Sequence, residues 1–158
     1  MRRYASGAPW EAIVGYSRSV RVGPRIYVSG TTATDPRGAI VGPGDPYAQT
    51  VRALDNVQRA LEALGGRIVD VTRVRVFVRD FQDFDAIARG LSERFDGIRP
   101  AATMVAVNGF VDPAMRVEIE ADADVGPYTS VPRRGSLSAG RPARPVRRRR
   151  EPARRRPS

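Results

Sequence analysis

The chain of 158 residues contains no cysteine, no histidine and no lysine, so all 27 of its basic residues are arginines. Without cysteine and histidine, the chain cannot build a Ser–His triad, a thiolate nucleophile or a zinc site of the usual ligands. Without lysine, it cannot form a Schiff base with a carbonyl substrate. An enzyme made from this sequence must move protons with carboxylates, tyrosines or bound water. We expect neither a metal nor another cofactor.

Long apolar runs are also missing. No stretch approaches the roughly 20 residues that a membrane-spanning helix needs. The arginines at positions 2 and 3 are not followed by the apolar segment of a secretion signal. We therefore expect a cytoplasmic protein that has no membrane partner.

The positive charge is confined to the C-terminal part of the chain. Residues 1–126 carry 16 arginines and 16 acidic residues, whereas residues 127–158 carry 11 arginines and one glutamate, which accounts for the net charge of +10. The second segment is rich in Arg, Pro, Ser, Gly and Ala and has no periodic apolar residues, which is typical of disorder. We predict one domain at residues 1–126 and a disordered tail at residues 127–158. Nucleic acid could bind only through this tail.

The pattern of apolar residues predicts an α+β fold. Strands are predicted at residues 15–22, 25–30, 71–78, 103–107 and 115–123, and helices at residues 46–64 and 83–95. The first helix has the clearest signals, because Asp45 can cap it, Pro46 suits its first turn and Gly65 can end it. The order β-β-α-β-α-β-β predicts a sheet with both helices on one face.

Alternation along the strands assigns residues to the two faces of this sheet. The residues expected to meet the helices are Ile26, Val28, Val74, Val76, Val78, Val105, Val107, Val117 and Ile119. The residues expected on the opposite face are Tyr27, Ser29, Arg73, Phe77, Met104, Glu118 and Glu120. This mixture of apolar and charged side chains predicts a subunit interface with clefts, and a face that is simply wetted by water is the alternative.

Six short motifs follow one another in a fixed order across residues 13–124. They are Gly15-Tyr16-Ser17, Ile26-Tyr27-Val28-Ser29-Gly30, Leu54-Asp55-Asn56-Val57, Val76-Phe77-Val78-Arg79-Asp80, Arg99-Pro100-Ala101 and Val117-Glu118-Ile119-Glu120-Ala121. Together they resemble the RidA (YjgF) family of reactive-intermediate imine/enamine deaminases. The resemblance implies a chorismate-mutase-like subunit, a homotrimer with clefts between neighbouring subunits, and a small imine, enamine or related metabolite as the partner.

The resemblance also implies roles for individual residues. Glu118 matches the catalytic glutamate that orders the attacking water. Tyr16 matches the tyrosine of the first strand, and Ser29, beside Gly30, matches the serine that lines the cleft. Glu118 is therefore the candidate catalytic residue, although a structural glutamate bonded to backbone donors, or to an arginine across the interface, is the alternative.

One residue of the family pattern is replaced. The arginine that binds the carboxylate of a 2-imino acid is represented by Ala102, which is followed by Thr103. Loss of a bidentate ion pair in a partly dry cleft weakens binding by about 1.5–3 kcal/mol. The substrate is therefore not expected to be a simple 2-imino acid. Arg99 could take over only if the turn at Pro100 folds back.

Three functions remain open from the sequence. The first is hydrolytic deamination of imines or enamines, and the second is a trimer that binds a small ligand in the same cleft without turnover. The third is an RNA-interacting protein that uses its basic tail, because some members of the family have been described as ribonucleases. The third ranks last, since a chain without histidine lacks the usual acid–base pair for RNA cleavage.

Overall fold

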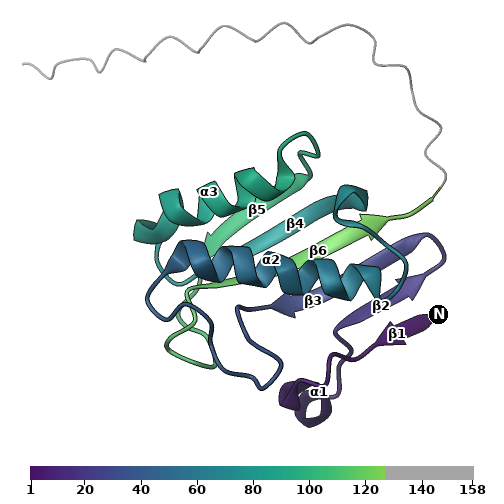
Figure 1. Cartoon of the computed structure of the whole chain (residues 1–158), viewed down its shortest axis with the longest axis horizontal. Coiled ribbons are helices and arrows are strands. Elements are labelled where there is room, and N and C mark those ends of the chain that lie inside the picture. The colour runs from purple at the N-terminus through teal and green to yellow at the C-terminus, as the bar shows by residue number, and fades with distance from the viewer. Residues whose placement is uncertain (127–158) are drawn as a thin grey trace, which may run out of the picture. The chain divides into compact units, whose positions relative to one another are not determined.

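A computed structural model describes residues 1–126, which form one six-stranded mixed sheet (Figure 1). The strands are β1 (Arg2–Tyr4), β2 (Ser19–Val22), β3 (Arg25–Thr31), β4 (Val71–Val78), β5 (Ala101–Ala106) and β6 (Val117–Asp124). The helices are α1 (Pro9–Val14), α2 (Pro46–Glu62) and α3 (Phe84–Phe95), with 3₁₀ turns η1 (Ile68–Asp70) and η2 (Phe81–Asp83). The predicted tail at residues 127–158 lies outside the described residues.

The predicted order of strands and helices is confirmed, and two short elements precede it. β1 and α1 were not predicted, and β2 begins only at Ser19. The chain cannot be extended from residue 15, as the sequence suggested, because Gly15 ends α1 in the left-handed conformation, with φ 80°. Residues 5–18 therefore form a compact turn around α1 beside the sheet.

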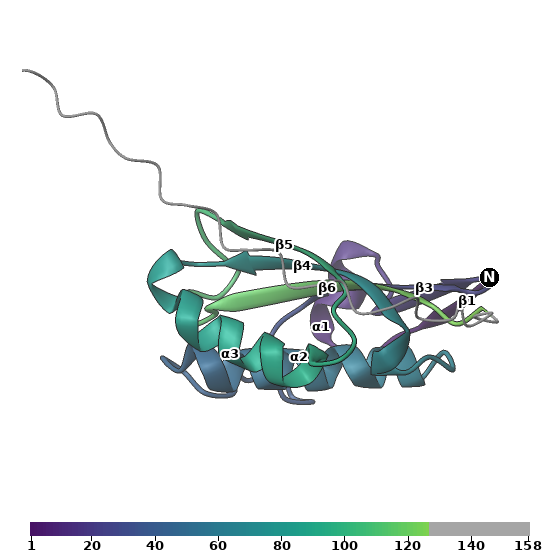
Figure 2. The ribbon, with the colours of Figure 1, turned by 90° about the horizontal axis from the view of Figure 1, so that it is seen from above.

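Helices α2 and α3 cover one face of the sheet, as predicted, and Figure 2 shows both on the same side. Asp45 caps α2, since its carboxylate accepts a hydrogen bond from the backbone N–H of Ala48 at 2.9 Å. Apolar residues at a spacing of three and four turn one side of α2 towards the sheet. The largest fully buried side chains include Ile26, Leu54, Leu61, Leu64, Ile87 and Ile119.

The predicted faces of β5 are wrong. Met104 packs against the core, whereas Val105 is 42% exposed. The parallel pairing of β4 with β5 sets Met104 beside buried Val76, and Val105 beside Phe77. Apolar residues occupy consecutive positions in β5, so both faces of this strand carry apolar side chains. The alternation of residues therefore cannot show which of the two faces meets the helices.

β6 lies at the centre of the sheet, in the strand order β1-β2-β3-β6-β4-β5. It is antiparallel to both β3 and β4. The pairing with β3 shifts between Val28 and Thr31, so Ser29 and Gly30 together oppose the single residue Glu120. This β-bulge bends β3 at the point where the candidate site lies. No helix within residues 1–126 is long and apolar enough to cross a membrane.

Candidate functional site

A cavity of about 440 Å³ opens where β3 bends, and its walls come from distant parts of the chain. Residues from β1, α1, β3, α2 and β6 line it, together with the loop at residues 32–38. Tyr16, Gly30 and Glu118, three of the predicted site residues, lie in its wall. The structure therefore brings together side chains that are about 100 positions apart in the sequence.

Glu118 reaches the cavity because of its place in β6. Val117 and Ile119 are fully buried on the helix side, so Glu118 points to the opposite face of the sheet. Burial raises the pKa of Glu118, the charge of Glu120 raises it further, and Arg18 opposes the shift. No side chain or backbone N–H within the described residues donates a hydrogen bond to its carboxylate. A partly desolvated carboxylate without a protein donor is available to bind water.

Gly30 provides the space that the Glu118 side chain occupies. A Cβ atom at position 30 would lie only 1.9 Å from Oε1 of Glu118 and 2.9 Å from its Cδ. The carboxylate therefore packs directly against the backbone of the β-bulge. Any side chain at this position would displace the Glu118 carboxylate.

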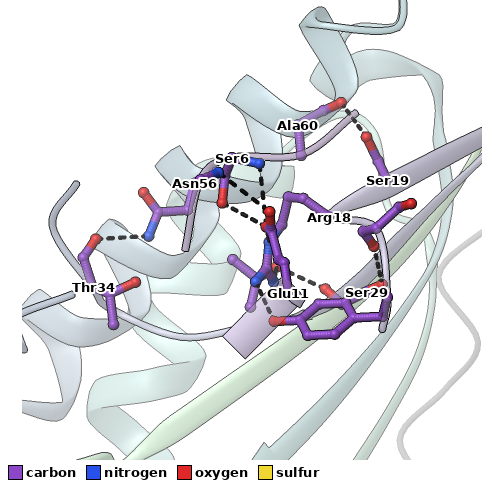
Figure 3. A network of polar contacts seen from close by, with 12 residues as sticks. Ser6, Glu11, Arg18, Ser19, Ser29, Thr34, Asn56 and Ala60 are labelled. Carbon is purple, nitrogen blue, oxygen red and sulfur yellow. Dashed lines mark hydrogen bonds and ion pairs between the residues drawn. The ribbon is translucent and has the colours of Figure 1, made fainter. Parts of the chain in front are cut away.

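Tyr16 belongs to a buried polar network centred on Arg18. The Arg18 guanidinium donates to the Tyr16 hydroxyl at 2.7 Å, to the Gly30 carbonyl at 2.6 Å and to Oγ1 of Thr31 at 3.1 Å. Its Nε lies 3.2 Å from Oε1 of Glu11 on α1. Figure 3 shows Ser6 and Arg18 converging on the Glu11 carboxylate. Sequence reasoning missed both Arg18 and Glu11.

The loop after β3 forms a further wall of the cavity. The Nδ2 group of Asn56 on α2 donates to the carbonyls of Thr32 and Thr34, which fixes this loop against the helix. Asp35 closes a turn by accepting from the backbone N–H groups of Arg37 at 2.8 Å and Ala39 at 2.9 Å. The bond from Ala39 is the main reason why the pKa of Asp35 is lowered.

The rest of the cavity is largely apolar. Pro9, Trp10 and Val14 line it from the α1 side, and Val111 and Met115 line it from the segment before β6. Trp10 is 47% exposed and Val111 is 74% exposed. The carboxylate of Glu118, the phenol of Tyr16 and the guanidinium of Arg18 therefore line the same cavity as exposed apolar side chains.

Ser29 lies beside the cavity and does not line it. Its hydroxyl donates to the carbonyl of Ser17 at 2.8 Å, which ties the bulge of β3 to the segment before β2. The oxygen of Ser29 keeps its capacity to accept a hydrogen bond.

Ala102 and Thr103 are not near Glu118 within one protomer. They lie on β5, two strands away from β6, which corresponds to roughly 10 Å. Ala102 faces the helices and lines a second, smaller cavity with Arg99 and Phe95. Thr103 pairs with Arg75 on the opposite face. Arg99 has a φ of 52°, so the chain turns sharply there, and its side chain shares the cavity of Ala102 and not that of Glu118.

No cluster of three or more potential metal ligands occurs in the part of the chain that the structure describes. The cavity groups that could interact with a substrate include the carboxylate of Glu118, the hydroxyl of Tyr16 and backbone groups near Gly30. This set can position water, accept a proton and donate a hydrogen bond.

Comparisons with known proteins agree with this architecture. The sequence model of the family described as endoribonuclease L-PSP matches residues 6–125. An uncharacterised protein of Streptomyces coelicolor is 39% identical over 130 residues, which cover 82% of this chain and 96% of that protein.

Solved structures resemble the chain over most of their length. A member of the YjgF/YER057c/UK114 family from Mycobacterium tuberculosis is 39% identical with a TM-score of 0.72, and the match covers 78% of this chain and 98% of that one. The structure of E. coli TdcF with bound serine is 28% identical with a TM-score of 0.64, over 69% of this chain and 87% of that one.

Proposed function

Because the chain belongs to the endoribonuclease L-PSP family, which includes YjgF and RidA proteins, we propose that it hydrolyses reactive imines or enamines to carbonyl compounds and ammonia. Glu118 carries this proposal. Its carboxylate is partly desolvated, has a raised pKa and lies in a cavity wall without a protein donor among the described residues. A structural glutamate bonded to backbone donors would have such donors, whereas one bonded to an arginine across a subunit interface would be identified by a Glu118→Gln variant that keeps its activity.

The proposed reaction uses Glu118 as a general base. Water bound to the carboxylate attacks the carbon of a protonated imine, and Glu118 takes one proton from that water as the C–O bond forms. Glu118 then returns this proton to the amino nitrogen of the carbinolamine. The C–N bond breaks, ammonia leaves with the electron pair of that bond, and it takes up the remaining hydroxyl proton to give the carbonyl product and ammonium. General acid–base catalysis of this kind contributes about 10²–10⁴-fold to the rate.

Tyr16 and Gly30 are the proposed substrate-binding groups from the same protomer, and Ser29 supports the backbone between them. Ala102 and Thr103 can join them only from another copy of the chain, because they lie two strands away within one protomer. We therefore propose a homotrimer in which β5 of a neighbouring subunit closes the cavity. The mixed face of the sheet, with Tyr27 and Val105 each 42% exposed, supports such an interface.

The proposed substrate lacks the carboxylate of an amino acid. Ala102 offers no guanidinium at the position that the family pattern gives to arginine, and Arg99 lies in the second cavity. Arg59 lines the first cavity from α2, where it donates to the side chain of Asn56. Arg18 has four of its five N–H groups engaged with Glu11, Tyr16, Gly30 and Thr31. The apolar lining from Trp10 and Met115 supports a partly apolar imine that has no carboxylate.

The test compares two carboxylate variants on two kinds of imine. An amine oxidase generates imines without a carboxylate in the assay, and an amino-acid oxidase generates 2-imino acids. Glu118→Gln should lower kcat/KM by about 10²-fold or more. Glu120→Gln is the matched control, because Glu120 lies on the same face, pairs with Arg75 at 3.3 Å and does not line the cavity. Equal rates for the parent and Glu118→Gln would remove the catalytic role of Glu118.

Binding of a small ligand without turnover is the second candidate, and one observation favours it. The related E. coli TdcF holds a bound serine in its crystal structure. Thermal-shift screening of amino acids and uncharged amines would reveal such binding. Ligands that stabilise the parent chain and not Gly30→Ala, together with no turnover of any imine, would support this second function over the first.

A further inference from the structure

The side chain of Arg18 is nearly buried and makes more hydrogen bonds than a solvent-exposed arginine requires. Its side chain is 11% exposed, and four of its five N–H groups donate to Glu11, Gly30, Thr31 and Tyr16 at 2.6–3.2 Å. Burial of a guanidinium is unfavourable unless each charge and donor finds a partner. A chain that only needed to connect α1 to β2 here could use an apolar residue, so this arrangement requires a further explanation.

Glu11 fixes the guanidinium in place. Its side chain is 6% exposed and accepts hydrogen bonds from Oγ of Ser6 at 2.6 Å, from the backbone N–H groups of Ser6 and Gly7 at 3.2 Å each, and from Arg18. Burial acts to raise the pKa of Glu11, but the bonds from Ser6 and Gly7 and the charge of Arg18 outweigh it, so the pKa is lowered. Glu11 is therefore ionised at neutral pH, and Arg18 keeps a permanent partner.

The contact with Tyr16 sets the direction in which that hydroxyl donates. The phenol oxygen accepts an N–H of Arg18 at 2.7 Å, and the guanidinium carbon lies 5.2 Å from the centre of the ring. Because the oxygen already accepts this bond, the O–H proton is free to donate to another group. Tyr16 lines the cavity, so a substrate atom there can receive that proton's hydrogen bond.

Arg18 and Glu118 contact the same residue from two sides. Arg18 binds the carbonyl of Gly30, and the Glu118 carboxylate packs against the α-carbon of Gly30. Bond lengths then limit the distance between the guanidinium and the carboxylate to about 9 Å or less. The other charged or titratable groups in the walls of this cavity are Tyr4, Asp35 and Arg59, and Glu120 follows on the same strand, paired with Arg75.

We propose that Arg18, which Glu11 holds in place, is a positioning residue that acts on both Tyr16 and Glu118. On one side it presents the Tyr16 hydroxyl to the cavity as a hydrogen-bond donor. On the other side it places a fixed positive charge near the Glu118 carboxylate. This inference rests on the proposed function, because it assigns the donor and the base to the same hydrolysis.

The first measurement does not need turnover. Glutamate labelled with ¹³C in the side-chain carboxyl is incorporated into the full chain, which has six glutamates, and the Glu118 signal is assigned by its loss in Glu118→Gln. In Arg18→Gln, the titration of Glu118 should move to higher pH, because a nearby positive charge is lost. Arg21→Gln is the matched control, since Arg21 also donates to backbone carbonyls, those of Gly23 and Leu64, and does not line the cavity. An unmoved Glu118 titration in folded Arg18→Gln would overturn the inference.

The second measurement uses the imine assay. In Arg18→Gln the acid limb of the pH profile of kcat/KM should move in the same direction as the Glu118 signal, and kcat should fall roughly tenfold because Tyr16 loses its orientation. The double variant with Tyr16→Phe should lose little more than the worse single variant, since both remove one donor. Fully additive losses would contradict the proposed coupling. If the parent chain does not turn over imines, the proposed function fails, and the ¹³C titration still decides the role of Arg18.

Arg18→Lys covers the case in which Arg18→Gln does not fold. Lysine keeps the charge opposite buried Glu11 but cannot reproduce the planar fork of the guanidinium. The acid limb should then stay near that of the parent, while kcat falls as it does in Tyr16→Phe. A parental kcat in Arg18→Lys would show that the fork does not orient Tyr16.

Discussion

Replacement of Gly30 with alanine is expected to displace the Glu118 carboxylate while the fold remains intact. The added Cβ would lie 1.9 Å from Oε1 of Glu118, and real Cβ atoms essentially never approach another atom closer than 3.0 Å. The carboxylate oxygen must therefore move by at least 1.1 Å, the difference between these two distances. The change leaves every atom of Glu118 in the protein and alters only its position.

The effect on stability should be small. The clash involves the end of a flexible side chain, and Gly30 does not have the positive φ that would strain an alanine. An alanine at a permitted backbone conformation stabilises the fold by about 0.4–1 kcal/mol, because the unfolded chain loses freedom. A strained rotamer of Glu118 costs about 0.5–1.5 kcal/mol. The two contributions oppose each other, so the free energy of unfolding should change by no more than about 1 kcal/mol.

The effect on activity should be large. A displacement of about 1 Å at a reacting group can lower the rate about 10²-fold, which corresponds to about 2.7 kcal/mol of transition-state stabilisation. We therefore expect kcat/KM of Gly30→Ala for an imine to fall about 10²-fold in a stopped-flow assay, while urea unfolding gives a nearly parental free energy.

Gly109→Ala provides the control for this experiment. Gly109 has no atom within 4 Å of an added Cβ and no positive φ, so the same substitution should leave activity unchanged and stabilise the fold by about 0.4–1 kcal/mol. A value of kcat/KM for Gly30→Ala within threefold of the parent would refute the catalytic placement of the Glu118 carboxylate. A loss of more than about 3 kcal/mol of stability would instead show that position 30 matters mainly for folding.

Three further predictions concern pH, specificity and assembly. Because burial raises the pKa of Glu118 above its value in the unfolded chain, the ionised carboxylate destabilises the fold at neutral pH, and this penalty disappears as the pH falls to the unfolded pKa. Glu118→Gln should therefore raise the unfolding midpoint at pH 7 and lose this advantage near pH 4; an equal difference at both values would contradict the sign. Ala102→Arg should raise kcat/KM for 2-imino acids about tenfold or more, since a guanidinium pairs a carboxylate with two charge-assisted bonds, and no gain would show that the cleft is shaped for another group. Sedimentation equilibrium of the full chain should give three times the mass of one chain, whereas a monomer would contradict a site completed by β5 of a neighbour.

Local signals were enough to predict the longer elements of the fold. The α2 helix is predicted by Asp45 and Pro46 at its start and by apolar residues spaced along one helical face. The β4 strand runs over Val71–Val78, as its alternation predicted. The six residues of α1 gave no such signal, because the preceding Ala8 makes no side-chain cap and Ile13 and Val14 remain exposed.

Only part of the candidate site could be predicted from the sequence. The resemblance pointed to Glu118 and Tyr16, and alternation in β6 placed Glu118 on the correct face. Arg18 could not be identified, because its partners come from α1 and from the bulge of β3, and a bulge has no reliable sequence signature. Burial of a guanidinium depends on these distant partners, so only the folded chain reveals it.

The central place of β6 has a consequence for how the protein is made in the cell. At roughly 5–20 residues per second, a ribosome needs about 2–10 s to proceed from the end of β4 to the end of β6. Throughout that interval the nascent β3 and β4 have no common neighbour, and their free edges can recruit a wrong partner. A chain whose translation stops before residue 117 would leave these two edges unpaired and would lack Glu118. Completion of the sheet and of the proposed site thus depends on the arrival of one late segment.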